Sequence, residues 1–229
     1  MNEGEALLAA ILASPDDDTP RLVYADWLDE HDEPERAEFI RLQIALAHAP
    51  TIALRAREGA LLHAHESAWL SALKAEKGPL YGEAHGKFRR GFIEVVWMSA
   101  TAFLERATEL FVAVPLRELR LTTTTVVQLA ELVHSPLFER LAGLDLSDRR
   151  MGDTAVIAAL LGHKAGSLRL LRLRGCGITD VGAYGMATTF KWSLRELDVS
   201  HNPISSAGVE ALRNRYGDAV IAEGMIPTA

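Results

Sequence analysis

The sequence predicts an α/β fold in which short parallel strands, each followed by a helix, come after a helical N-terminal region. Two observations carry this prediction. An apolar pattern with short alternating segments recurs in the last two thirds of the chain, with copies beginning at residues 92, 116, 141, 168 and 194. The first third instead spaces its apolar residues as a helix does, between prolines and acidic turns. Strands and helices that alternate on one period form a parallel sheet joined by right-handed crossovers.

The clearest copy of the pattern runs from Leu168 to Ile178 and reads LRLLRLRGCGI. Its two central leucines alternate with Arg172 and Arg174, so we expect a strand that buries the leucines and exposes the arginines. The spacing L-x-x-L-x-L-x-x-[NC]-x-[LI] resembles the leucine-rich repeat. The same signature returns at Leu194, Leu197, Val199, Asn202 and Ile204. The resemblance implies a short solenoid with its parallel sheet on the concave face and its helices on the convex face.

Three earlier copies are less regular, because none has Asn or Cys in the ninth position. They comprise Leu141, Leu144, Leu146 and Met151; Leu116, Leu119, Leu121 and Val126; and, most faintly, Phe92, Val95, Trp97 and Ala100. Helices are expected after the strands at residues 101–111, 126–134, 154–162, 180–189 and 206–215, and residues 216–221 could supply a truncated final strand or a flap. We therefore predict a repeat domain of about five repeats over residues 86–229.

A separate all-α domain is predicted for residues 1–85. Its helices are expected at residues 5–13, 20–31, 34–48 and 55–77. Pro20 and Pro34 suit the first turn of a helix, where the missing amide proton is not needed, and Gly78-Pro79 ends the fourth helix.

Residues 6–46 resemble the repeat-companion domain, a short module near the N-terminus of bacterial proteins that often carry leucine-rich repeats. The matching segments are Pro15-Asp16-Asp17-Asp18, Arg21 to Leu28 and Pro34 to Arg41, and Arg90 to Val95 resembles the start of the repeats in such proteins. The resemblance implies an architecture and no activity.

Charge and composition exclude several classes of function. The net charge of −7 argues against a nucleic-acid-binding surface. No apolar run approaches the roughly 18 residues of a membrane span, and the acidic start MNEGEALLAA does not look like a secretory signal. One cysteine cannot form an internal disulfide, so we expect a cytoplasmic protein.

Each motif with catalytic or ligand-binding potential has a structural interpretation that we favour. The basic run Lys87 to Arg90 is interpreted as an exposed turn, and His63 and His65 cannot face one metal from a single helix. Gly175-Cys176-Gly177 lacks the third glycine of a dinucleotide fingerprint, and the repeat register turns the cysteine inward.

The acidic residues lack the spacing of a calcium loop, so we expect helix capping, with Asp26 in a partly buried ion pair to Arg21, Arg36 or Arg41. No metal or cofactor is predicted. The acidic set is Asp16, Asp17, Asp18, Asp26, Asp29 and Asp32.

The sequence thus predicts a non-catalytic module that binds another protein. The outward fifth position of the five copies should form a column of alternating charge: Val96, Arg120, Asp145, Arg172 and Asp198. Because the arginines of this column should already be paired with its aspartates, we expect a partner protein to bind at the flanks of the column or on the helical domain. Candidate contact residues are Met98, Thr122, Leu170, Arg174, Ser200 and Trp27. The alternative is an enzyme whose site lies around Asp26, Trp27, His31 and Arg41.

Overall fold

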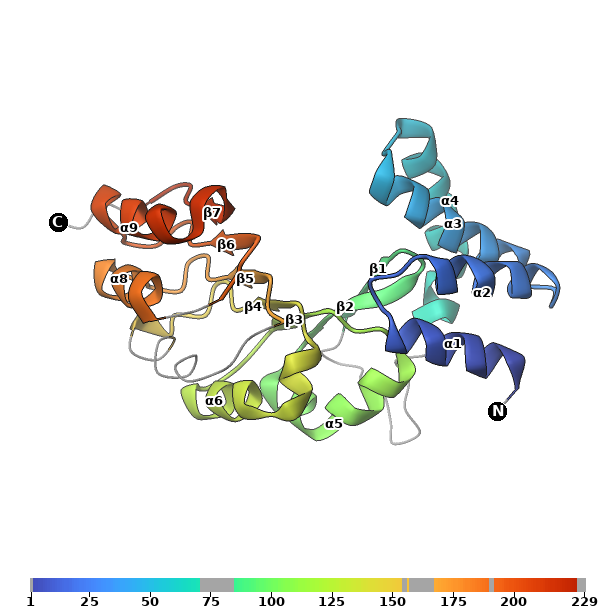
Figure 1. The fold of residues 1–229 in the computed structure, drawn as a ribbon, viewed down its shortest axis with the longest axis horizontal. Helices are drawn as coiled ribbons and strands as arrows, with labels where there is room; N and C mark the ends of the chain where they lie inside the picture. The colour runs from blue at the N-terminus through green and yellow to red at the C-terminus, as the bar shows by residue number, and fades with distance from the viewer. Residues whose placement is uncertain (1, 71–84, 154–155, 157–166, 190–191, 226–229) are drawn as a thin grey trace. The chain divides into compact units, whose positions relative to one another are not determined.

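The computed structural model describes residues 2–70, 85–153, 156, 167–189 and 192–225. It is a mixed α/β structure with a helical N-terminal part (Figure 1). Seven strands lie in one sheet, in the order in which they occur along the chain. The chain divides into two compact units, of which the first comprises residues 1–96 and 108–116 and the second residues 97–107 and 117–229.

Four helices build most of the first unit: α1 (Glu3–Ala13), α2 (Thr19–Asp29), α3 (Pro34–His48) and α4 (Ile52–Trp69). Prolines occupy the first turns of α2 and α3, as predicted. The helix α1 begins two residues earlier than predicted because Asn2 and Glu5 form a capping box. The helix α4 also begins early, where the Thr51 side chain accepts a hydrogen bond from the Leu54 amide. The predicted continuation of α4 over residues 71–77 lies outside the described residues.

A hairpin of two strands belongs to the same unit, apart from the last two residues of its second strand. Strand β1 (His85–Arg89) and strand β2 (Phe92–Met98) are joined by Arg90 and Gly91, both with positive φ. Two such residues form the turn whose twist suits a tight hairpin. The prediction of an exposed turn over Lys87 to Arg90 is therefore wrong in part. Phe88 is buried, and of these four residues only Arg90 lies in the turn.

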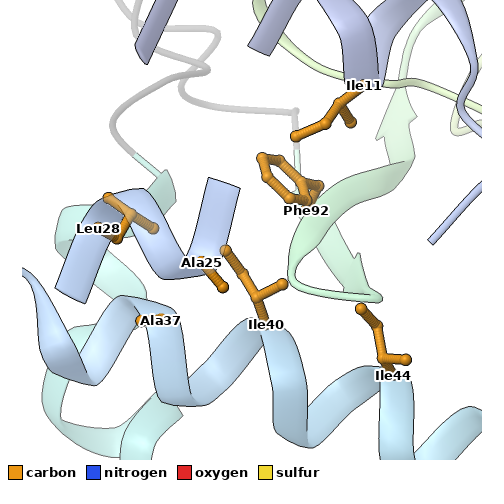
Figure 2. Packing of buried hydrophobic residues seen from close by; sticks show 7 residues of the cluster. All are labelled: Ile11, Ala25, Leu28, Ala37, Ile40, Ile44 and Phe92. Atoms are coloured by element: carbon orange, nitrogen blue, oxygen red, sulfur yellow. The ribbon is translucent and has the colours of Figure 1, made fainter. Parts of the chain in front are cut away.

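The hairpin contributes to the apolar core of the first unit (Figure 2). Its Phe92 ring lies among aliphatic side chains from α1, α2 and α3, so one aromatic side chain joins three helices. Gly91 is needed at this contact, since a Cβ there would lie 2.4 Å from a side-chain carbon of Ile40 and its φ of +84° strains any other residue. The cluster contains Ile11, Ala25, Leu28, Ala37, Ile40, Ile44 and Phe92.

The second unit alternates strands and helices. Its strands β3 (Glu118–Leu121), β4 (Gly143–Asp145), β5 (Leu170–Arg172), β6 (Glu196–Asp198) and β7 (Val220–Ile221) pair in parallel, each with the next. The helices α6 (Val126–His134), α8 (Asp180–Thr189) and α9 (Ser206–Tyr216) lie where helices were predicted, and α5 (Ala100–Ala113) extends beyond its predicted bounds. Short 3₁₀ turns occupy Pro136–Arg140 and Gly217–Ala219. The helix predicted over residues 154–162 lies outside the described residues except for Val156.

Burial confirms the central apolar positions of the repeats from the second copy onward, whereas Met151 and Leu194, also predicted to point inward, are partly exposed. Leu171 and Leu173 are fully buried, as are the equivalent leucines of β3 and β4. The first copy is displaced by one residue from the predicted register: Val96 and Met98 are fully buried, whereas Trp97, predicted to point inward, is partly exposed. A second correction concerns Val126, which begins α6 and is exposed instead of filling the core.

Candidate functional site

The strands β3 to β6 carry a set of outward-pointing side chains, partly exposed except for the buried Glu118, which we call the strand face. Along each strand its residues alternate with a buried leucine, so successive side chains point to opposite sides of the sheet. The parallel register aligns Arg120 with Asp145, Asp145 with Arg172 and Arg172 with Asp198. These four residues therefore form the aligned column that the sequence predicted. The strand face comprises Glu118, Arg120, Asp145, Leu170, Arg172, Glu196 and Asp198.

Ion pairing on the strand face differs from the predicted column. Arg120 lies 3.8 Å from Asp145, but Arg172 pairs with Glu196 at 2.5 Å and with Glu118 at 3.3 Å. Both glutamates lie in the neighbouring column, two residues earlier along their strands. The long arginine side chain can reach the diagonal position, whereas the short Asp198 carboxylate accepts a hydrogen bond from the Ser200 amide. Val96, the predicted first member of the column, is buried.

Only part of the predicted contact set is exposed at the flanks of the strand face. Arg174 is exposed and Leu170 and Thr122 are partly exposed. Met98 and Ser200 are buried, at 0% and 1% exposure, which corrects their expected exposure. Met98 fills an inward strand position, and the Ser200 hydroxyl accepts a hydrogen bond from the Glu223 amide in the segment after β7.

The turns after the strands are held by two buried side chains in equivalent positions. Asn202 donates to the carbonyls of Leu173 and Val199 at 2.7 and 2.9 Å and accepts from the amide of Ile178 at 3.0 Å. Cys176 donates its weaker S–H to the Leu146 carbonyl. Burial raises the pKa of the Cys176 thiol to about 12, so the thiolate needed for nucleophilic chemistry does not form near neutral pH. The predicted inward orientation of Cys176 is confirmed.

Aspartate side chains form a second link between neighbouring repeats, which the sequence analysis did not predict. Asp153 accepts hydrogen bonds from the amide and hydroxyl of Thr179, one repeat later along the chain. Asp180 accepts from the Ser205 amide in the same way. A Cβ at Gly182 or Gly208 would lie within 2.3 Å of the aspartate oxygen, so both helices carry glycine there. The recurring Ile-[TS]-x-x-Gly spacing, Ile178 to Gly182 and Ile204 to Gly208, was the available signal.

The residues proposed for an enzymatic site belong to α2, the turn after it and α3, and they form two separate contacts. Arg41 binds Asp26 at 2.5 Å and Asp29 at 2.8 Å. The predicted ion pair of Asp26 is therefore present, with Arg41 as its partner, but its expected partial burial is wrong, because the Asp26 side chain is 71% exposed. His31 lies beyond the end of α2 and stacks on Trp27, with ring centroids 4.1 Å apart. Arg41 thus has two carboxylate partners, which neutralise the cation that this site would offer to an anionic substrate.

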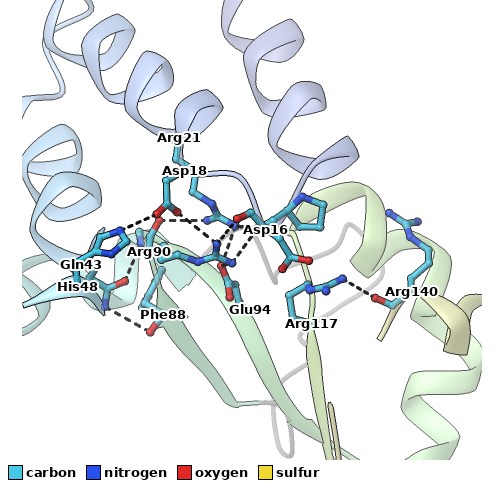
Figure 3. A network of polar contacts seen from close by, with 12 residues as sticks. Asp16, Asp18, Arg21, Gln43, His48, Phe88, Arg90, Glu94, Arg117 and Arg140 are labelled. Carbon is cyan, nitrogen blue, oxygen red and sulfur yellow. Dashed lines mark hydrogen bonds and ion pairs between the residues drawn. The ribbon is translucent and has the colours of Figure 1, made fainter. Parts of the chain in front are cut away.

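A buried ion-pair cluster, missed from the sequence, holds the hairpin against the helices (Figure 3). Arg21 is fully buried, and its guanidinium lies 2.8 Å from both the Glu94 carboxylate and the Pro15 carbonyl. Arg90 binds the same two acceptors at the same distance and also reaches Asp18. Pro15, Asp18 and Arg21 lie in the segments that resemble the repeat-companion domain. In the structure their contacts with Arg90 and Glu94 hold the hairpin against α2. We call Arg21, Arg90 and Glu94 the hairpin cluster.

The acidic residues serve several local purposes. Asp17 accepts a hydrogen bond from the Thr19 amide at the start of α2. Hydrogen bonds from the amide and the side chain of Thr19 lower the pKa of Asp17. Asp18 pairs with Arg90 and His48 instead of capping the helix. Within the described ranges, His, Cys, Asp and Glu side chains form no group of three that could hold a metal ion. His65 stacks on Trp69, with centroids 5.0 Å apart.

Comparison with known protein families identifies two of the repeats. The sequence model described as Leucine Rich repeat matches residues 167–187 and 193–212, which are the two clearest copies of the predicted pattern. No curated protein and no solved structure matches the chain. Leucine-rich repeats generally serve as protein interaction modules. Among the helices described here, none has both the length and the apolar character to cross a membrane.

Proposed function

We propose that this protein is a non-catalytic scaffold that binds another protein through the strand face of a short leucine-rich-repeat solenoid. The matched repeats support the class of function, since stacked repeats of this kind create extended binding surfaces. The single observation that carries the proposal is the register of β3 to β6, which aligns outward side chains from four strands on one surface.

The contact residues we propose lie where the strand face is least neutralised. Arg174 is exposed, and Leu170 is a partly exposed apolar side chain among charged neighbours. By contrast, Arg172 is paired with two glutamates, so a partner that bound Arg172 would first have to break two ion pairs. Interfaces favour arginine and apolar anchors over charges that are already paired. We therefore propose Leu170 and Arg174 as contacts, with Thr122 beside the face and Trp27 on the helical domain as further candidates.

The remaining features of the proposal follow from the sequence. Residues 1–85 would form a helical domain that includes a repeat-companion module at residues 6–46, as in bacterial proteins, and residues 86–229 would form the repeat domain. The buried, unpaired Cys176 suits a reducing, cytoplasmic setting. We propose no cofactor.

Site-specific photo-crosslinking in the native host tests this proposal. A photoreactive residue at position 170 should give a discrete crosslinked product with one host protein. The matched control places the same residue at Val181, which is 70% exposed on α8 and outside the strand face. Equal crosslinking from both positions, or none from position 170, would contradict the proposed contact surface.

A further inference from the structure

The guanidinium of Arg36 lies among four aromatic rings in the first unit. Arg36 stands in the first turn of α3, and its central carbon is 5.0 to 5.7 Å from the centroids of the rings. The rings also contact one another, for example Phe39 and Trp69 at 4.6 Å. A cation is attracted to the negative faces of such rings, so they hold the guanidinium in place. The rings belong to Phe39, Trp69, Phe88 and Phe92.

Arg36 has no carboxylate partner among the described residues. Its Nη1 atom is buried and has no hydrogen-bond acceptor in the described part of the chain. The other arginines around it are paired: Arg21 and Arg90 with Glu94, and Arg41 with Asp26. Arg21 makes the comparison direct, because it packs against Phe92 as well and still has a carboxylate. A buried donor without an acceptor is costly, so an acceptor supplied from outside would be stabilised there.

Arg36 and its four rings are incompletely covered at two residues. Phe39, Phe88 and Phe92 are buried, whereas Arg36 and Trp69 are partly exposed. Burial lowers the pKa of Arg36 to about 10, which leaves the side chain charged at neutral pH. A small ligand would therefore approach this cation from the side of Arg36 and Trp69.

We propose that Arg36 and Trp69 form a binding site for a carboxylate carried on an aromatic or other apolar group. A planar carboxylate matches the fork of guanidinium donors, and the apolar part of the ligand would lie against the indole. A phosphate dianion suits the site less, because apolar surroundings penalise the more strongly hydrated charge. This site is independent of the strand face, since it lies in the first unit and uses different chemistry.

The direct test uses the full-length protein with ¹⁵N-labelled arginine, and benzoate as the probe. The Nε–H signal of Arg36 is assigned by its loss in Arg36→Lys. Benzoate at constant ionic strength should shift this signal saturably, whereas benzamide, a neutral molecule of the same shape, should not. Inorganic phosphate should bind at least about tenfold more weakly than benzoate. The Arg41 signal serves as an internal control, because Arg41 is already paired.

Thermal unfolding provides the second readout. Benzoate should raise the melting temperature of the wild type and of Arg41→Met, but not that of Arg36→Met, because a ligand that binds only the folded state stabilises it. If Arg36→Met does not fold, the wild-type titration alone decides. An unchanged or non-saturable Arg36 signal, an equal response to benzamide, or tighter binding of phosphate would overturn the proposed site.

Discussion

The Glu118 carboxylate crosses strand β4 to reach Arg172, two strands away, at a distance of 3.3 Å. It does so above Gly143, the residue of β4 that pairs with both Glu118 and Leu170. A Cβ at Gly143 would lie 2.6 Å from the Glu118 Cγ. Because Gly143 has no side chain, Glu118 of β3 can extend across β4 and pair with Arg172 of β5.

Replacing Gly143 by Ala should lower the free energy of unfolding by about 1 kcal/mol, because Glu118 must leave its path and its pair with Arg172 is lost. Urea unfolding measures the change. In a Glu118→Ala background the same replacement should cost much less, since the closest contact, with the Glu118 Cγ, is then absent and only the Leu170 Cβ lies near, at 3.3 Å. Equal costs in the two backgrounds would show that Gly143 and Glu118 act independently.

Asn202→Ala should be among the most damaging single changes, at about 3 kcal/mol or more. The replacement removes hydrogen bonds from two buried carbonyls, those of Leu173 and Val199, and from the buried Ile178 amide. Asn202→Cys should cost less, because cysteine occupies the equivalent place at position 176 and its S–H can still donate to one carbonyl. Chemical denaturation of both variants compares them, and an alanine variant as stable as the cysteine variant would be inconsistent with this role.

The thiol of Cys176 should not react with an aromatic disulfide reagent at pH 7.5 to 8.5 while the protein is folded. Its pKa is raised by burial to about 12, so the reactive thiolate is absent across this window. Absorbance at the wavelength of the released thiol follows the reaction. Unfolding in guanidinium chloride is the control and should give one equivalent of product. Rapid labelling of the native protein would exclude the buried position.

Glu94→Gln should destabilise the protein by about 3 to 5 kcal/mol, since Arg21 and Arg90 then lose their shared buried counterion. The matched control is Asp26→Asn, which also removes one carboxylate charge bound to an arginine. Because Asp26 is exposed, its loss should cost at most about 1 kcal/mol. Similar melting temperatures for the two variants would mean that the hairpin cluster does not secure the hairpin.

The sequence predicted what depends on periodicity and spacing. The inward leucines, the helices α3, α6 and α8, and the inward Cys176 follow from patterns of two, 3.6 and about 25 residues. The register failed in the first copy, where β2 is apolar at nearly every position, so that periodicity alone could not decide between Phe92 and the next residue as its start.

Side-chain partners were harder to predict than burial. Arg172 was expected to bind the residue directly opposite, but its length allows diagonal pairing with Glu196. The partner of Arg21 is Glu94, more than seventy positions away in the sequence, and no local pattern indicates such a contact. Predictions from spacing therefore reach the backbone and the core, while the ion pairs require the three-dimensional structure.

The most direct test of the proposed function is the affinity of the crosslinked partner for three purified forms of the full chain. Leu170→Ser/Arg174→Ser should bind at least about tenfold more weakly than the wild type, which corresponds to about 1.4 kcal/mol. Asp145→Arg, which removes the ion pair with Arg120 and leaves Leu170 and Arg174 unchanged, should keep nearly full affinity with a slightly lower melting temperature. Unchanged affinity in the double variant, or lost affinity in a folded Asp145→Arg variant, would contradict the account.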